Sequence, residues 1–344
     1  MMHEDIDGIQ NQRVSDWFSN NIAGIELPLT YELIAGGHSN LTYKVIDAKG
    51  NEKVLRRPPL GHVLATAHDM EREHRIISAV GTTDVPVPKA LGVCEDLAVN
   101  DAPFYVMEYV DGFVLHSQED AETVPLDERR ALGRAVAEVL GRLHAIEPSQ
   151  IGLGELGKRE DYLGRQLRRW TRQWEQSKTR ELKEMEQVQL LLADKKPIQV
   201  GATIVHGDYR LGNMLTNSGR ILAVLDWELC TLGDPLADVG YLLNNWVSPG
   251  EIDNEGEGDQ SPTAVGGYPS REALCAIYEA RTGRDLSMIN YYRAFQHWRL
   301  AAIGQGVYKR YLVGAMGESR EVDLDRQKEG VARRAEAALE LLES

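Results

Sequence analysis

The pattern of apolar and polar residues along the chain changes character near residue 110. Before it, short apolar stretches separated by turn residues predict β-strands at 31–34, 41–47, 52–57 and 104–110. Helical spacing of apolar residues predicts a helix at 14–20 and another at 69–80. Pro86 and Pro88 predict an extended segment after the second helix.

Beyond residue 110, apolar residues recur every three to four positions over long stretches, as in helices that bury one face. This spacing predicts helices at 126–146, 161–193, 271–282 and 287–311, and a terminal helix from residue 322. Residues 248–270 are rich in glycine, proline and acid, so we expect an exposed, mobile loop there. The order of elements predicts an α+β protein with a small β-rich N-terminal lobe, 1–110, and a larger, mainly helical lobe, 111–344.

The composition of the chain excludes only a few classes of function. The net charge of −15, from 38 basic and 53 acidic residues, argues against a nucleic-acid backbone as a partner. No apolar run approaches the ~18 residues of a membrane span, and the acidic N-terminus shows no secretory signal. The three cysteines are widely spaced, which disfavours a disulfide framework or a zinc site. We therefore expect a cytoplasmic protein with no nucleic-acid or membrane partner.

The clearest chemical signal is the stretch His206-Gly-Asp-Tyr-Arg-Leu-Gly-Asn213, followed by an apolar run that ends in Asp226. Four residues separate Asp208 from Asn213, as in the kinase catalytic loop, where the Asp orients or deprotonates an acceptor hydroxyl and the Asn binds metal. Carboxylate and amide oxygens are the ligands that Mg²⁺ prefers. Taken alone, His-Gly-Asp would be an ordinary turn after a strand. The combination with Asn213 and Asp226 favours phosphoryl transfer.

Several further motifs occur in the same order as in one known family. They are GGHSNLTY at 36–43, VLRRPP at 54–59, FYVMEYVDG at 104–112, HGDYRLGNML at 206–215, LDWE at 225–228 and LGDPLADVG at 232–240. With these motifs the chain resembles the aminoglycoside phosphotransferase family, and most closely its branch associated with acyl-CoA dehydrogenases. The resemblance implies a bilobal protein-kinase-like fold and an ATP- and Mg²⁺-dependent kinase that phosphorylates a hydroxyl group.

The resemblance also implies roles for individual residues. Asp208 would be the catalytic carboxylate, and Asn213 and Asp226 would bind Mg²⁺. Arg210 stands where protein kinases often place a Lys that contacts the transferred phosphate, so its guanidinium fork would serve there or form a surface ion pair. Glu228 would be a further metal ligand or, as we favour, a solvated acid. Asp234 and Asp238 are expected to be structural, with Asp238 bracing the catalytic loop.

The nucleotide would be held mainly by residues of the small lobe. The loop residues Gly37, His38, Ser39 and Asn40 would approach its phosphates, and backbone groups of the linker at Glu108 and Val110 would bind adenine. Where the family expects Lys on the third strand, this chain has Arg56, with Glu73 as its expected partner and Glu71 as the alternative. Because Arg and Lys are not interchangeable, the preference between ATP and GTP stays open.

The sequence leaves three hypotheses for function. The branch resemblance favours a kinase for hydroxyacyl-CoA and a functional link to acyl-CoA dehydrogenases, and the basic run at 165–172 would suit such an anionic substrate. An aminoglycoside or amino-sugar kinase is the second hypothesis. A nucleotide-binding pseudokinase or scaffold is the third, and only Arg56 favours it. Trp170 and Trp174 lie within or beside the basic run, which equally fits a packed helix with a solvated basic face.

Overall fold

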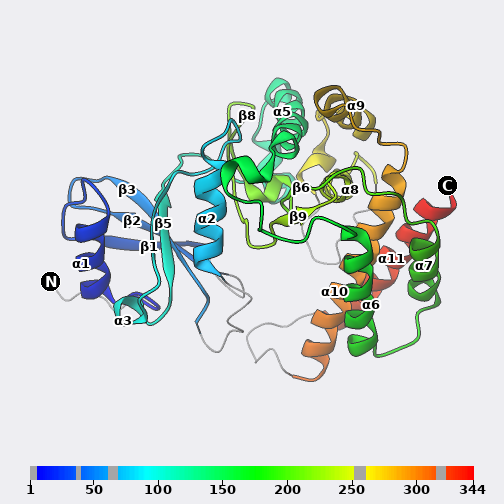
Figure 1. Cartoon of the computed structure of the whole chain (residues 1–344), viewed down its shortest axis with the longest axis horizontal. Coiled ribbons are helices and arrows are strands. Elements are labelled where there is room, and N and C mark those ends of the chain that lie inside the picture. The colour runs from blue at the N-terminus through cyan, green and yellow to red at the C-terminus, as the bar shows by residue number, and fades with distance from the viewer. Residues whose placement is uncertain (1–5, 36–39, 61–68, 252–260, 315–322) are drawn as a thin grey trace. The chain divides into compact units, whose positions relative to one another are not determined.

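The computed structural model describes residues 6–35, 40–60, 69–251, 261–314 and 323–344. These residues fall into two units, whose elements are labelled in Figure 1. The first comprises Met1–Gly112, Ile151–Leu153 and Leu222–Glu228, and the second comprises Phe113–Gln150, Gly154–Ile221 and Leu229–Ser344. Asp226 therefore belongs to the first unit, although it lies far along the chain from the rest of it.

A five-stranded antiparallel sheet with strand order β1-β2-β3-β5-β4 is the main element of the first unit. Its strands are β1 (Thr30–Ala35), β2 (Leu41–Ile46), β3 (Glu52–Arg57), β4 (Ala90–Cys94) and β5 (Phe104–Glu108). Helices α1 (Asn11–Asn21) and α2 (Met70–Val80) lie on opposite sides of this sheet (Figure 1), and α3 (Leu97–Asn100) is one short turn. The sequence pattern predicted all of these strands except β4, which it gave only as an extended segment.

Side chains that alternate along the strands give the sheet two different faces. Leu55, Phe104 and Val106 share a hydrophobic core with Val14 and Phe18 of α1. Each neighbouring position on a strand points to the other face, and there the sheet meets α2. This alternation places Arg56, next to Leu55, on the polar side of the sheet.

The second unit is mainly helical. Its helices are α4 (Gln118–Glu122), α5 (Leu126–Ala145), α6 (Tyr162–Ser177), α7 (Lys183–Asp194), α8 (Leu236–Asn244), α9 (Arg271–Thr282), α10 (Ile289–Leu312) and α11 (Leu324–Glu343). Short strands β6 (Thr203–Val205) and β9 (Thr231–Gly233) pair antiparallel. Strand β7 (Met214–Asn217) is paired with β8 (Arg220–Val224), whose residues from Leu222 onward belong to the first unit. Helix α10 contacts α6, α7, α8 and α11 and is buried on most sides, so it forms the centre of the helical packing.

Two predictions from the pattern were wrong in part. The helix predicted at 161–193 is interrupted between α6 and α7, where the backbone leaves the helical conformation at Lys178 (φ −55°, ψ 135°) and Gln305 of α10 donates to the Ser177 carbonyl. The loop predicted at 248–270 contains a 3₁₀ turn, Pro262–Val265, whose Thr263 is buried and donates to the Val247 carbonyl at 2.8 Å. Residues 252–260 of this loop lie outside the described residues.

Among the residues that the structure describes, no helix combines the length and the apolar character needed to cross a membrane.

Candidate active site

The loop that carries Asp208 follows strand β6 and is held by α8. The Asp238 carboxylate on α8 accepts hydrogen bonds from the backbone N–H groups of His206 and Gly207, at 2.6 and 2.8 Å. Arg299 of α10 donates to the Gly207 carbonyl at 3.1 Å. Gly207 adopts a φ of 87°, which glycine adopts without the strain of a side chain. The loop is therefore fixed at its start by two buried side chains, and Asp238 has the bracing role expected of it.

Both carboxylate oxygens of Asp208 accept hydrogen bonds from side chains of the second unit. The Tyr241 hydroxyl donates to Oδ1, and the Asn213 Nδ2 donates to Oδ2 at 2.7 Å and to the Asp208 carbonyl at 2.8 Å. The Arg210 Nε lies 3.5 Å from Oδ1. Burial by itself raises the pKa of Asp208, but the Arg210 charge and the Tyr241 and Asn213 hydrogen bonds outweigh it and hold that pKa below its usual value of 3.8. Asp208 is thus an ionised, oriented carboxylate at neutral pH.

Asn213 is arranged as a metal ligand requires. Its amide nitrogen donates two hydrogen bonds to Asp208, one to the carboxylate and one to the backbone carbonyl. Its amide oxygen accepts no hydrogen bond from the described residues. An amide oxygen without a protein donor is a suitable ligand for a hard cation such as Mg²⁺. The donor set at Asn213 therefore fits the metal that the sequence predicts.

In the first unit, one arginine bridges two carboxylates. Arg56 of β3 donates from Nε to Glu73 of α2 at 3.2 Å and from Nη2 to Asp226 Oδ1 at 2.7 Å. Glu73, and not the alternative Glu71, is the partner. Tyr105 on β5 also donates to Glu73, at 3.1 Å. The cluster therefore connects the sheet, α2 and the segment that carries Asp226.

Burial and charge act in opposite directions in this cluster. Burial disfavours the charged guanidinium, but Tyr105, Glu73 and Asp226 more than compensate and raise the pKa of Arg56. Glu73 is only 1% exposed, and its burial raises the pKa of that carboxyl although Arg56 lowers it. Asp226 has a φ of 63°, an uncommon conformation for a residue with a side chain and one that recurs at functional sites.

Comparison with known proteins places the chain in a family. The sequence profile of the APH group, the Phosphotransferase enzyme family, matches residues 30–274 of the chain. The chain belongs to this family. It is a phosphotransferase with an alcohol group as acceptor, as the resemblance predicted.

The phosphotransferase is similar in sequence to part of larger proteins. Acyl-CoA dehydrogenase family member 10 of Mus musculus is 39% identical over 282 residues, which cover 81% of this chain and 26% of that protein. Acyl-CoA dehydrogenase family member 11 of Gallus gallus is 33% identical over 292 residues, covering 83% of this chain and 37% of that protein. The chain thus spans well under half the length of these relatives, and the predicted resemblance to the branch associated with acyl-CoA dehydrogenases is confirmed.

Solved structures confirm the protein-kinase-like α+β fold. A Ralstonia eutropha JMP134 protein assigned as an aminoglycoside phosphotransferase is 33% identical, with a TM-score of 0.81 and coverage of 96% of this chain and 98% of that one. The aminoglycoside phosphotransferase APH(4)-Ia has a TM-score of 0.63 at 17% identity, with coverage of 96% and 98%. At that identity the second likeness concerns the fold alone.

The residues predicted to hold the nucleotide are only partly placed. Gly37, His38 and Ser39 lie outside the described residues. Asn40 is buried and donates to Glu73 Oε1 at 3.1 Å and to Glu228 Oε2 at 3.5 Å, so it belongs to the acidic cluster around Arg56. Its contact with a nucleotide stays a prediction.

At the linker, Glu108 and Val110 differ in whether their backbone hydrogen-bonding groups already have partners. The Glu108 N–H already donates to the Lys89 carbonyl at 2.9 Å. Val110 lies after the end of β5, and its backbone groups form no hydrogen bond with any described residue. Of the two predicted adenine contacts, Val110 therefore has the free backbone groups that such a contact needs.

Sequence reasoning missed Tyr241. It lies one residue beyond the LGDPLADVG motif and three residues after Asp238 on α8, a spacing that puts both side chains on one helix face. The Arg299 guanidinium lies over the Tyr241 ring, 5.6 Å from its centroid. The i, i+3 spacing from Asp238 was the signal that could have identified it.

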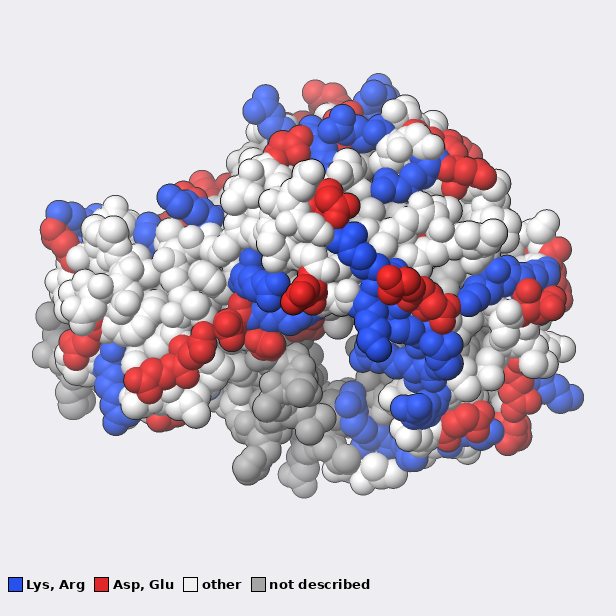
Figure 2. Space-filling model, in the orientation of Figure 1, with Lys and Arg blue, Asp and Glu red and all other residues white. Residues whose placement is uncertain are grey.

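The basic run on α6 forms a solvated face. Trp174 is buried, while Lys and Arg side chains gather on the surface over α6 (Figure 2). Arg168 and Lys196 pair with Asp161, at 3.2 and 2.7 Å, so part of this charge is already neutralised. The contacts therefore fit the packed helix with a basic face that the sequence left open.

Proposed function

We propose that this phosphotransferase is an ATP- and Mg²⁺-dependent kinase whose acceptor is the hydroxyl group of a hydroxyacyl-CoA thioester. The observation that carries the kinase assignment is the geometry of Asp208. Its two oxygens are fixed by Tyr241 and Asn213, and its loop is fixed by Asp238. A carboxylate oriented in this way is suited to bind the acceptor hydroxyl, which is the positioning that phosphoryl transfer requires.

In the proposed reaction, Asp208 accepts a hydrogen bond from the acceptor hydroxyl and directs its oxygen. That oxygen forms a bond to the γ-phosphorus of ATP, the bond from this phosphorus to the β,γ-bridging oxygen breaks, and ADP leaves. The hydroxyl proton passes to Asp208. Arg210, which pairs with Asp208 before substrate binds, donates to the phosphoryl oxygens as negative charge develops on them.

Nucleotide and metal would be held by the remaining predicted residues. Asn213 and Asp226 would bind Mg²⁺, which neutralises charge on the β- and γ-phosphates when bound. Arg56 would contact the phosphates while Glu73 keeps its guanidinium in place. The loop residues Gly37, His38, Ser39 and Asn40 and the linker residues Glu108 and Val110 would complete the site. Support for ATP comes from APH(4)-Ia, which has been solved with ADP and hygromycin B and with AMP-PNP and hygromycin B.

The acceptor class is supported by the relatives named acyl-CoA dehydrogenase family members 10 and 11, which contain a region similar to this chain. The competing acceptor class is an aminoglycoside, supported by the assignment of the similar Ralstonia protein. A pseudokinase is not favoured, because Arg56 forms the ion pair with Glu73 that an active small lobe needs.

The test is Mg²⁺-dependent release of ADP from ATP in the presence of hydroxyacyl-CoA thioesters, aminoglycosides, amino alcohols and simple sugars. The proposal expects stimulation by hydroxyacyl-CoA, abolished by Asp208→Asn. Stimulation by aminoglycosides alone would overturn the acceptor class, and equal turnover by Asp208→Asn and the parent would overturn the role of Asp208.

A further inference from the structure

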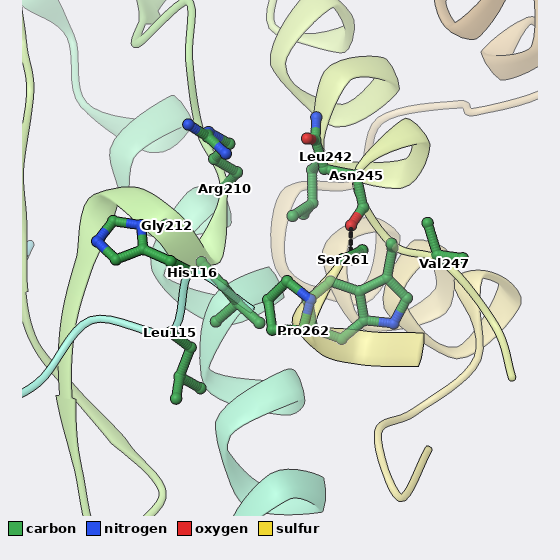
Figure 3. Close-up of a pocket in the computed structure, with 11 residues that line it drawn as sticks. Leu115, His116, Arg210, Gly212, Leu242, Asn245, Val247, Ser261 and Pro262 are labelled. Carbon is green, nitrogen blue, oxygen red and sulfur yellow. Dashed lines mark hydrogen bonds between the residues drawn. The ribbon is translucent and has the colours of Figure 1, made fainter. Parts of the chain in front are cut away.

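A small pocket, with a cavity volume of about 30 Å³, opens in the second unit beside the catalytic loop. Figure 3 shows that Arg210 and Gly212 of the loop contribute to one side and that residues from the end of α8 and from the Ser261–Pro262 segment contribute to the other. Since Arg210 Nε also lies 3.5 Å from Asp208 Oδ1, this pocket adjoins the carboxylate that we propose binds the acceptor hydroxyl.

Most polar groups of the pocket are already satisfied. The Asn245 carbonyl accepts from the Ser261 hydroxyl at 2.7 Å, and the Asn245 side-chain amide donates to the Tyr241 carbonyl at 2.9 Å. The Trp246 Nε1 donates to the Pro269 carbonyl at 2.8 Å. This ring therefore offers the pocket carbon atoms, beside the buried side chains of Leu242 and Val247.

Arg210 and His116 are the basic side chains of the pocket. A Cβ atom on Gly212 would lie 3.2 Å from Arg210 Nη1 and 3.5 Å from His116 Nδ1, so the two nitrogens converge on the space that glycine leaves open. An oxygen atom of a ligand near this space can accept a hydrogen bond from each side.

His116 is held in place by its neighbours. Leu115 is fully buried, and the Asp120 carboxylate accepts from the backbone N–H groups of His116 and Ser117, both at 2.9 Å. The latter contact is part of the capping box of α4, which a hydrogen bond from Asp120 N–H to the Ser117 hydroxyl completes. The backbone at His116 is thus preorganised, which reduces the entropy lost when its ring binds a ligand.

The described residues that line the pocket include no aspartate or glutamate. A polycationic aminoglycoside would place ammonium groups next to Arg210 with no carboxylate from this lining to pair with them, which is unfavourable for buried charge. An acyl group is favoured there, because its carbonyl oxygen accepts hydrogen bonds from Arg210 and His116.

Resting on the proposed kinase function, we propose that His116 is a specificity-determining residue of the acceptor site. It binds an acyl oxygen of the acceptor. The site thereby selects hydroxyacyl compounds over diols, which lack the acyl oxygen, and over cationic amino sugars.

The test compares kcat/KM for a hydroxyacyl-CoA thioester, for a diol of matched chain length and for an aminoglycoside. In the parent enzyme we expect kcat/KM to be highest for the thioester, lower for the diol and lowest for the aminoglycoside. His116→Ala should lower kcat/KM for the thioester about tenfold, the effect of losing one hydrogen bond, and change that for the diol by less than about twofold. His116→Gln retains an N–H donor and should recover part of the loss. Glu119→Ala, an exposed change three residues away, is the matched control and should alter neither rate.

The outcomes separate this inference from the kinase function. Phosphorylation of the thioester with equal losses on thioester and diol in His116→Ala would overturn the inference and leave the kinase function intact. Efficient phosphorylation of the aminoglycoside by the parent would also overturn it. Absence of Mg²⁺-dependent transfer to every acceptor would overturn the proposed function and this inference together.

Discussion

Replacing Tyr241 by phenylalanine tests how the structure orients Asp208, the proposed catalytic carboxylate. The substitution keeps the ring under the Arg299 guanidinium and removes only the hydroxyl that donates to Asp208 Oδ1. Arg210, at 3.5 Å, is then the remaining cation at that oxygen. The carboxylate gains freedom to rotate about its terminal bond.

The size of the effect follows from the type of hydrogen bond that is lost. A hydrogen bond to a charged group contributes about 1.5–3 kcal/mol, and each 1.4 kcal/mol corresponds to about tenfold in rate. If the contact holds Asp208 in its reactive orientation, kcat should fall roughly 10- to 100-fold in Tyr241→Phe. KM for ATP should change little, because the hydroxyl acts on the carboxylate that meets the acceptor.

The assay is steady-state release of ADP, together with a thermal melt of each variant. Tyr291→Phe is the matched control, because it also removes a buried hydroxyl that donates, at 2.8 Å, to the Leu192 carbonyl away from the catalytic loop. Both variants should melt at similar temperatures, and only Tyr241→Phe should lose turnover. A kcat for Tyr241→Phe within about twofold of the parent would refute the reasoning.

Two further predictions concern the metal and acid stability. Asp226→Ala should abolish the Mg²⁺ dependence of nucleotide binding, and isothermal titration showing unchanged Mg·ATP affinity would contradict the metal role. Burial first, and then repulsion by Arg334 and Arg293, lowers the pKa of His297 to about 3, from an unperturbed value of 6.5. Because the folded state then binds fewer protons than the unfolded chain, stability falls as pH decreases from about 6.5 to about 3, by roughly 2 kcal/mol between pH 6.5 and 5. Urea denaturation at both pH values should show a smaller loss in His297→Gln, and equal losses in the two proteins would contradict this assignment.

Local spacing was sufficient for much of the site. One short loop sets the separation of Asp208 from Asn213, so the sequence predicted that the two residues act together. In the structure, Asn213 Nδ2 lies 2.7 Å from Asp208 Oδ2. The family resemblance paired Arg56 with Glu73, with Glu71 as the alternative, and the 3.2 Å contact between Arg56 Nε and Glu73 Oε2 agrees with the first choice.

Contacts between residues far apart in the chain could not be predicted from local sequence spacing. Tyr241 lies 33 residues from Asp208, and its i, i+3 spacing from Asp238 indicates a shared helix face without stating that its hydroxyl faces the Asp208 carboxylate. The break between α6 and α7 was missed for the same reason, because the Ser177 carbonyl is satisfied by Gln305, 128 residues away.

The most direct test of the account is detection of the phosphorylated product itself. Labelled γ-phosphate from Mg·ATP is followed onto a hydroxyacyl-CoA thioester by the parent and by Asp208→Asn under single-turnover conditions. The account predicts a phosphate ester at the acceptor hydroxyl with the parent and essentially none with Asp208→Asn, while both proteins bind Mg·ATP with similar affinity. Transfer by Asp208→Asn at the parent rate would contradict the claim that Asp208 orients the acceptor.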